Sequence, residues 1–332
     1  MTPTAHRLAP APSAAHHPSL LRRVLRALAI AACLPYISLK IVWVAGGEIG
    51  IPAGSVLLEQ RTLLAVANSI SVLADAAVVV LALLLTQAWG LRVRAWLLAF
   101  PMWAATGLLA PIVAGYPAQL AVALLSGDER AAAPSEPFLD GWVFAVVYGG
   151  FILQGLTLGT LFVLYARDRW GHVRRGGRLG ELSARTSGPG VRAAALAGAV
   201  ASLVPATVQL IWLSGSARGL SAQRAAERDT DFYVLSAIHL AFLVTAVVFT
   251  LLLVLRRPAR LGVRPVLALA WVSTGTAGCW GAYMSLVALM PETDPAKQVT
   301  GLAQLSYAGE MITGFLLAAC VAVFLRRRSA EA

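Results

Sequence analysis

Eight long apolar stretches recur along the chain, and they constrain its fold more than any other feature. At a rise of about 1.5 Å per residue, a helix of about 20 residues covers the roughly 30 Å hydrocarbon core of a bilayer. Because only helices and closed barrels satisfy their backbone hydrogen bonds in lipid, the stretches predict an all-α polytopic membrane protein with eight transmembrane helices. We place these helices near residues 24–45, 62–86, 95–116, 141–166, 192–214, 232–255, 265–289 and 302–325.

The composition agrees with this class. Of the 332 residues, 58% are hydrophobic and 13% are charged, and the mean hydropathy is +0.73. Such a chain is too apolar for a water-soluble domain of this length. The net charge of +11 does not indicate a nucleic-acid partner, because the basic residues fall in short blocks between the apolar stretches. The expected partner is the lipid bilayer.

The basic residues lie mainly on one side of the predicted membrane. Eight helices divide the connecting segments into two sets, of which one carries 20 Lys and Arg residues and the other carries 6. The less basic set holds 11 of the 16 acidic residues. Because basic loops tend to stay in the cytoplasm, we expect a multi-pass protein of the cell membrane with cytoplasmic N- and C-termini.

The two halves of the chain repeat a weak pattern in the same order. Lys-x-x-Trp-x-x-Gly at 40–46 matches Gln-x-x-Trp-x-x-Gly at 209–215. Four helices per half give both halves the same orientation, so the pattern predicts a 4+4 parallel internal repeat about an axis along the membrane normal. The alternative is coincidence, because Trp and Tyr mark membrane interfaces and Gly and Pro are common in membrane helices. Further matches are Pro35 with Pro205, Glu59 with Glu227, Val93-Arg94 with Val263-Arg264, and Tyr148-x-Gly150 with Tyr307-x-Gly309.

The pattern divides the chain into five segments, with one repeat on either side of a basic loop. The N-terminal residues are rich in Ala, Pro and His and lack periodicity, which is typical of a disordered cytoplasmic tail. The first apolar stretch has no clear cleavage site, so we interpret it as an uncleaved helix. The expected segments are 1–20 as a tail, 21–167 as the first four-helix repeat, 168–191 as the basic cytoplasmic loop, 192–328 as the second four-helix repeat and 329–332 as a tail.

Six polar residues within or beside the apolar stretches are the candidates for a substrate or ion cavity: Lys40, Glu310, Asp75, His239, Gln209 and Asn68. Helix rise places most of them about 8 to 12 Å below the outer surface and places Asp75 nearer the midplane. An unpaired charge in hydrocarbon costs several kcal/mol, so Lys40 needs a partner. Depth favours Glu310 as that partner. The alternatives are Asp75, Glu48, a water-filled cavity, or snorkelling of Lys40 to the outer headgroups.

The acidic candidates are not repeated: each occurs in one half of the chain and has an apolar residue at the equivalent position of the other half. Phe151 stands at the repeat position of Glu310, and Leu243 stands at that of Asp75. An unsymmetrical polar cluster in a duplicated frame is typical of a binding cavity between repeats, where many transporters hold substrate. A structural ion pair that locks the halves together is the alternative. The matching prolines of the first and fifth stretches are expected to kink their helices near this layer.

No motif for catalysis, a cofactor or a metal is found in the sequence, which lacks HExxH, GxSxG and a phosphate-binding loop. His239 is the single histidine within an apolar stretch, which argues against a haem held by two histidines. The three cysteines lie singly in apolar stretches and predict no disulfide. We therefore expect no catalytic residues, no cofactor and no metal site. The loop from Arg167 to Arg192 is expected to anchor the cytoplasmic side, with anionic lipid or a partner as an alternative ligand.

The run at 35–47, Pro-Tyr-x-x-Leu-Lys-x-x-Trp-x-x-Gly-Gly in a chain rich in Ala and Arg, resembles uncharacterised multi-pass membrane proteins of actinobacteria. This resemblance implies no activity. The residues themselves favour a small-solute or ion transporter with a polar cavity between the repeats. The alternative is a non-transporting membrane scaffold or a regulatory subunit of a partner complex, and a membrane-embedded enzyme ranks third.

Overall fold

The computed structural model describes residues 19–53, 55–59, 61–126, 139–171, 177–292 and 294–331. The protein is 80% helix, with no strand in this described part, so the predicted all-α class is confirmed. The α-helices are α1 Leu20–Val44, α2 Val56–Glu59, α3 Arg61–Leu84, α4 Ala95–Ser126, α5 Gly141–Arg169, α6 Pro189–Ala201, α7 Leu203–Leu213, α8 Ala222–Ala226, α9 Thr230–Leu255, α10 Val263–Ala288 and α11 Gly301–Glu331. Short 3-10 helices are η1 Ala88–Arg92, η3 Leu179–Glu181 and η4 Ala184–Thr186.

Six segments are long and apolar enough to cross a membrane, judged by length and composition over the described residues. They are α1, α4, α5, the α6–α7 pair, α9 and α11. α3 contributes a shorter apolar part, Asn68–Leu84. α10 is 26 residues long but falls outside the six, because Ser, Thr and Gly make its middle less apolar. The six segments mark the chain as a multi-pass membrane protein.

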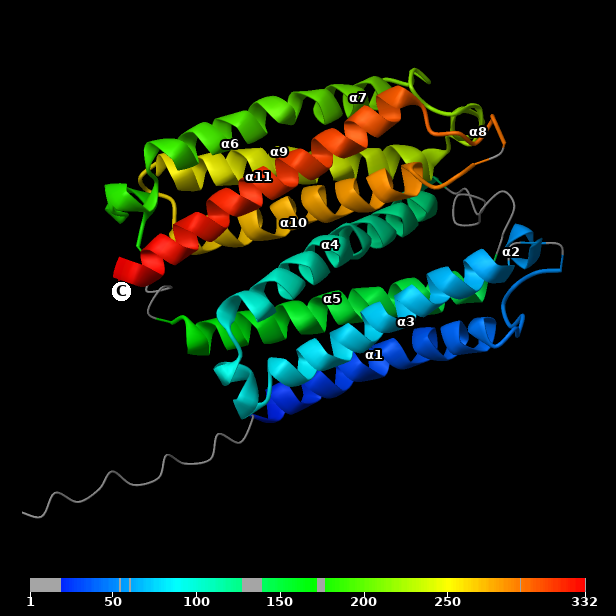
Figure 1. The fold of residues 1–332 in the computed structure, drawn as a ribbon, viewed down its shortest axis with the longest axis horizontal. Coiled ribbons are helices and arrows are strands. Elements are labelled where there is room, and N and C mark those ends of the chain that lie inside the picture. The colour runs from blue at the N-terminus through cyan, green and yellow to red at the C-terminus, as the bar shows by residue number, and fades with distance from the viewer. Residues whose placement is uncertain are drawn as a thin grey trace, which may run out of the picture.

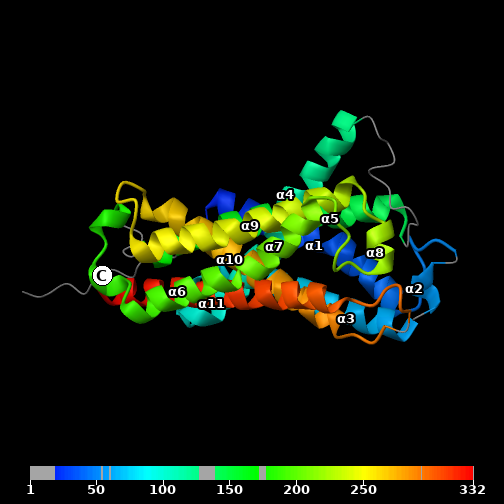
Figure 2. The ribbon, with the colours of Figure 1, turned by 90° about the horizontal axis from the view of Figure 1, so that it is seen from above.

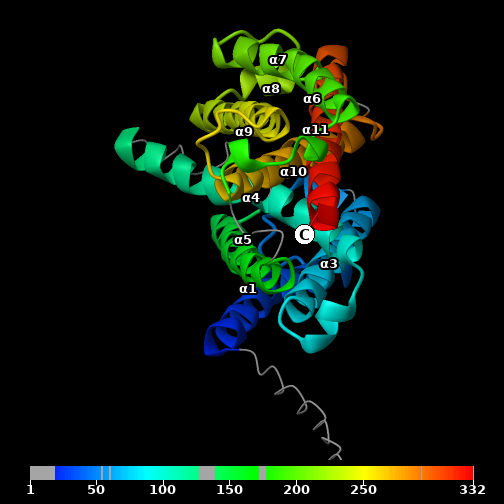
Figure 3. The ribbon, with the colours of Figure 1, turned by 90° about the vertical axis from the view of Figure 1, so that its left-hand side faces the viewer.

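The helices form two groups that meet along α4 and α10 (Figures 1 and 3). The first group is α1, α3, α4 and α5, in which α1 packs on α3 and α5, and α5 also packs on α4. The second group is α6, α7, α9, α10 and α11, in which α10 packs on α9 and α11. The start of α1 and the end of α11 lie at one end of the molecule, which we call the basic end, and α2 and α8 lie at the opposite end (Figure 1).

The composition of α10 reflects its central place. Its middle turns, from Ser273 to Gly278, are buried against α4, α9 and α11. A Cβ added at Gly275 would lie 2.8 Å from the Trp103 carbonyl oxygen of α4, and one at Gly281 would lie 2.3 Å from the Met311 nitrogen of α11. Small residues let helix backbones approach closely in membranes. A helix enclosed in this way needs less apolar surface than one that faces lipid.

Trp103 and Trp271 link α4 and α10 by two reciprocal hydrogen bonds. Trp103 Nε1 of α4 lies 3.2 Å from Thr274 Oγ1 of α10, and Trp271 Nε1 of α10 lies 3.2 Å from Thr106 Oγ1 of α4. Between these bonds the two backbones touch at glycine: a Cβ at Gly107 would lie 2.3 Å from the backbone carbon of α10 opposite it. Both helices carry Trp-x-x-Thr-Gly here, at 103–107 and 271–275, an offset of 168 residues.

α1 and α7 end in the same way. Gly46 follows α1 with φ +89° and Gly215 follows α7 with φ +87°. At each end the glycine N–H bonds back three residues, and the next N–H bonds back five residues, to Val42 in α1 and to Ile211 in α7. These bonds are those of a Schellman motif, which needs a left-handed residue and so favours glycine.

The tryptophan three residues before each of these glycines forms a hydrogen bond with the backbone of the loop that follows. Trp43 Nε1 donates to the Ile49 carbonyl at 2.8 Å, and Trp212 Nε1 donates to the Arg218 carbonyl at 3.0 Å. Both indoles are buried. Donor and acceptor therefore recur at the same offset of 169 residues in the two halves.

Three boundaries differ from those expected. α4 continues ten residues beyond the predicted end, and its last turns project from the body of the molecule (Figure 2). The predicted fifth helix is interrupted at Ser202, because Pro205 has no N–H to bond the Ala201 carbonyl one turn earlier. Pro35 does not interrupt α1. α11 continues to Glu331, so the described part of the predicted tail at 329–332 is helical, whereas nearly all of the predicted tail at 1–20 lies outside the described residues.

Arginines brace the basic end. Arg22 of α1 forms an ion pair with Asp168 of α5. Arg169 donates to the Gly90 carbonyl in η1 at 3.2 Å, and Arg256 donates to the Leu182 carbonyl at 2.8 Å. Part of the predicted 168–191 loop packs into the core, where Leu179 and Leu182 are buried. Some of the basic charge therefore holds loops together.

Candidate functional site

Lys40 is held inside the first group. Its Nζ donates to Asn68 Oδ1 of α3 at 2.6 Å. The same nitrogen lies 4.7 Å from the ring centroid of Tyr36 and 5.1 Å from that of Trp43, both on its own helix. Tyr36 and Trp43 are four residues before and three residues after Lys40, so one face of α1 presents all three side chains. A half-buried cation is thus satisfied by an amide oxygen and two aromatic faces.

Asp75 lies in the middle of α3, beside the same cation. Its carboxylate interacts with the Lys40 ammonium and with the side chain of Gln154 from α5. Gln154 Nε2 also lies 3.3 Å from Cys33 Sγ of α1. Asp75, Gln154 and Cys33 are all buried. We call Lys40, Asn68, Asp75, Gln154 and Cys33 the Lys40 cluster, and it joins α1, α3 and α5.

The Lys40 cluster leaves polar atoms unpaired. Asp75 Oδ2 and Asn68 Nδ2 are buried without a hydrogen-bond partner. Buried polar groups in proteins almost always have partners, and lipid supplies none. Asp75 Oδ2 can therefore take up a proton or accept a hydrogen bond from water, and Asn68 Nδ2 can donate one to water.

Glu310 belongs to a separate cluster in the second group. Gln209 Nε2 of α7 lies 3.4 Å from Glu310 Oε1 of α11, and both side chains are buried. Gln209 Oε1 and the hydroxyl of Ser306, one turn from Glu310, have no partner. We call Gln209, Ser306 and Glu310 the Glu310 cluster. Like the Lys40 cluster, it contains a buried carboxylate, an amide and a polar atom without a hydrogen-bond partner.

The expected pairing of Lys40 with Glu310 is wrong. Each side chain bonds within its own helix group, and no ion pair joins them. Depth along a helix does not show which helix group a side chain faces, and Lys40 and Glu310 bond within different groups. Snorkelling of Lys40 is also not observed, since Asn68 directs the ammonium toward α3.

His239 joins neither cluster. It is half-buried on α9, and its ring packs perpendicular to that of Trp280 on α10, with 5.7 Å between centroids. The six candidates therefore divide into three in the Lys40 cluster, two in the Glu310 cluster and His239 alone.

Sequence reasoning overlooked Gln154 and Cys33 as site residues. Gln154 does carry a signal in the sequence, because an amide in the middle of an apolar helix indicates polar contacts. Cys33 gave no such signal, because cysteine packs as a small apolar residue.

The chemistry that the two clusters suit is proton or ion binding. Each has one carboxylate, an amide and an unpaired polar atom in a buried setting. Within the described part of the chain, no group of three His, Cys, Asp or Glu side chains is placed to hold a metal ion.

The fold and the clusters define an all-α multi-pass membrane protein with polar sites inside apolar helices. Compared with protein-family models, curated proteins and solved structures, the chain matches none of them. The two clusters are therefore the features of the molecule that bear on its function.

Proposed function

We propose that the protein is a small-solute or ion transporter of the cell membrane, and that the ion it moves is a proton. The observation that carries this proposal is Asp75 Oδ2, a buried carboxylate oxygen without a partner in the middle of an apolar helix. Ionisable residues in such positions are rare and mark ion and proton pathways. A proton suits this geometry better than an organic solute, because the side chains of each cluster touch directly.

Our proposal places one polar cluster in each half instead of one cavity between the halves. Lys40 and Gln209 occupy matching positions, and each bonds to an amide or carboxylate from a neighbouring helix. The clusters differ in charge, since one contains a cation and a carboxylate and the other contains a carboxylate alone. We propose that they act as two proton-binding steps.

The eight-span count and the 4+4 repeat are part of the same proposal. Support comes from the two Schellman ends, the two indole-to-loop hydrogen bonds and the reciprocal contact of α4 with α10. A contact in which residue i meets j and the equivalent of j meets i is expected at a two-fold axis. We infer that α3 and α10 also cross the membrane and that the axis passes between Gly107 and Gly275.

We propose cytoplasmic N- and C-termini, because the basic end would then obey the positive-inside rule. The start of α1 and the end of α11 share that end (Figure 1). We also propose that the Arg167–Arg192 loop binds anionic lipid through arginines that do not bond to other parts of the protein.

A non-transporting scaffold is the second candidate, and the projecting end of α4 favours it. Leu124 and Leu125 are 83% and 89% exposed there, and exposed apolar side chains beyond the helix bundle suit a partner protein. In this candidate function, the polar clusters serve only to hold helices together.

Reconstitution into liposomes distinguishes the two candidates. We expect wild-type protein to carry protons along an imposed gradient and Asp75→Asn to carry fewer, whereas a scaffold would leave the liposomes as tight as protein-free ones. Glu227→Gln is the matched control, because Glu227 undergoes the same chemical change on an exposed turn where Gln223 donates to it.

A further inference from the structure

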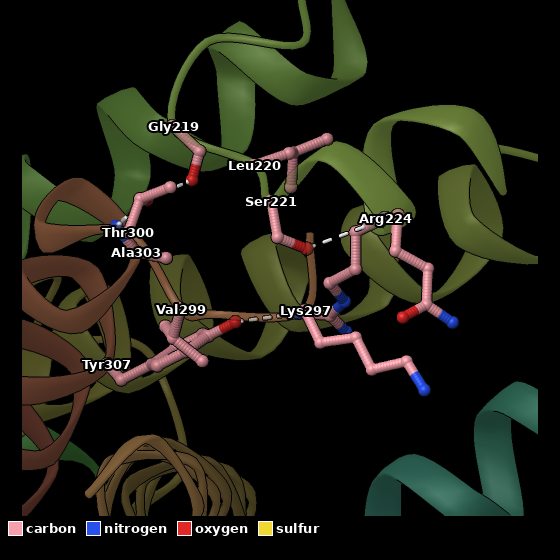
Figure 4. Close-up of a pocket in the computed structure, with 10 residues that line it drawn as sticks. Gly219, Leu220, Ser221, Arg224, Lys297, Val299, Thr300, Ala303 and Tyr307 are labelled. Atoms are coloured by element: carbon pink, nitrogen blue, oxygen red, sulfur yellow. Dashed lines mark hydrogen bonds between the residues drawn. The ribbon is translucent and has the colours of Figure 1, made fainter. Parts of the chain in front are cut away.

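A small pocket opens at the opposite end of the second group. It has a volume of about 80 Å³ and lies between the α7–α8 connection and the segment that leads into α11. Figure 4 shows Arg224 and Lys297 on one side and Thr300 on the other. The floor is formed by Tyr307, whose hydroxyl accepts a hydrogen bond from Arg224 Nη1 at 2.7 Å.

The polar groups around the pocket are mostly donors. Arg224 uses one guanidinium nitrogen on Tyr307, which leaves other N–H groups available. Ser221 Oγ accepts from the Arg224 backbone nitrogen at 3.3 Å, so its own proton is free to be donated. Lys297 adds an ammonium on a flexible stem.

Over the part of the chain that the structure describes, neither Arg224 nor Lys297 takes part in an ion pair. Both side chains are exposed at the rim. Lys297 is also one of only two lysines in the protein, the other being Lys40. Two unpaired cations and a hydroxyl around a space of this size are complementary to a small anion.

We propose that this pocket binds one oxyanion group, a phosphate or a carboxylate, through Arg224, Lys297 and Ser221. The guanidinium fork matches the paired oxygens of either group, and the ammonium supplies a second charge. The anion is a free solute or the headgroup of a lipid, since both present the same oxygens. This inference does not depend on proton transport.

The arginine of this pocket has no counterpart at the equivalent position of the first half. At the 169-residue offset Gly50 corresponds to Gly219, which lines the pocket, but Ser55 corresponds to Arg224. The Gly50 carbonyl accepts a bond from the Asp140 nitrogen, where the Gly219 carbonyl accepts one from Thr300 Oγ1. The two equivalent glycine carbonyls therefore have different partners, a backbone N–H in the first half and a threonine hydroxyl in the second.

The test uses the full-length protein, stripped of lipid in a neutral detergent. Its thermal unfolding midpoint is measured with inorganic phosphate, with acetate and with short-chain phosphatidylglycerol, each against chloride at equal ionic strength. Binding to the folded protein raises the midpoint. Arg224→Gln and Lys297→Gln are each expected to weaken the apparent affinity by about tenfold, since each removes one charged partner.

Arg218→Gln is the matched control, because it removes the same charge from an exposed residue of the same connection outside the pocket. If Arg224→Gln fails to fold without its bond to Tyr307, Lys297→Gln alone decides the test. If phosphate or acetate raises the unfolding midpoint of the wild type but not of the pocket variants, the ligand is a free anion. If only the lipid raises the midpoint, and the pocket variants lose this effect, the ligand is a lipid headgroup. No shift with any probe, or equal shifts in wild type and pocket variants, overturns the proposal.

Discussion

The indole N–H of Trp103 in α4 donates to the hydroxyl of Thr274 in α10, and the equivalent indole in α10 returns the bond. Reciprocal bonds of equal length, 3.2 Å, make the contact between the helix groups nearly symmetric. The two glycines at its centre bring the backbones together. This contact is where we place the axis that relates the halves.

Removing either indole donor should cost the same. Trp103→Phe and Trp271→Phe each delete one hydrogen bond and one ring of the indole, so each is expected to lower the free energy of unfolding by at least about 0.5 to 1.5 kcal/mol, the contribution of the hydrogen bond alone. Thermal unfolding in detergent measures the loss. Trp96→Phe is the control, because Trp96 is exposed. A loss from one indole but not from the other would contradict a symmetric contact.

A methyl group at the centre of the contact should force the helix groups apart. Gly107→Ala is expected to destabilise the protein by about 1 to 3 kcal/mol, the usual cost of overpacking, because its Cβ would collide with the Gly275 backbone. Gly159→Ala in α5 is the control, because nothing lies within 4 Å of the Cβ it would add. The two variants are compared by their unfolding midpoints, and equal midpoints would show that α4 and α10 do not touch here.

The partner of Lys40 can be identified by a double-mutant cycle. Lys40→Met and Asn68→Leu should be coupled by about 0.5 to 3 kcal/mol, because the two side chains share a hydrogen bond. Lys40→Met and Glu310→Gln should be additive, since these residues belong to different clusters. Unfolding in denaturant supplies the free energies. Coupling with Glu310 and additivity with Asn68 would restore the pairing expected from depth.

The sequence predicted the all-helical class because apolar length is a strong signal, but it could not predict how the helices pack. Matching Val93-Arg94 with Val263-Arg264 implies an offset of 170 residues, whereas the Trp-x-x-Thr-Gly contact has an offset of 168. A shift of two residues rotates a position by about 200° around the helix axis, so it places a residue on the opposite face of the helix. The Val-Arg dipeptides mark only where the chain enters a helix, while the tryptophans and glycines make the contact.

The candidate site shows the same limit. Composition identified Lys40, Asp75 and Glu310 as intramembrane charges, because such residues are rare in apolar helices. Depth along a helix then suggested a partner, but rotation about the helix axis decides which neighbour a side chain meets. Asn68 and Gln154 lie on the faces that turn toward Lys40 and Asp75, and no pattern within a single helix reveals that.

The number of spans can be measured by labelling. If α10 crosses the membrane, Arg260→Cys before it and Glu292→Cys after it should lie on opposite sides, because both residues are exposed at the ends of this helix. Intact cells treated with a membrane-impermeant maleimide should be labelled at position 292 and not at position 260. The parent protein is the control, since Cys33 and Cys320 are buried and Cys279 is partly so. Labelling of both variants or of neither would contradict the crossing of α10.

The most direct test of the proposed function is proton flux into liposomes that contain the purified protein, driven by a potassium diffusion potential and followed by a trapped pH-sensitive dye. We predict flux in the wild type and in Glu227→Gln, and at least about a tenfold loss in Asp75→Asn and in Glu310→Gln, because each loses a buried carboxylate. Wild-type liposomes as tight as protein-free ones, or variants as active as the wild type, would contradict the account.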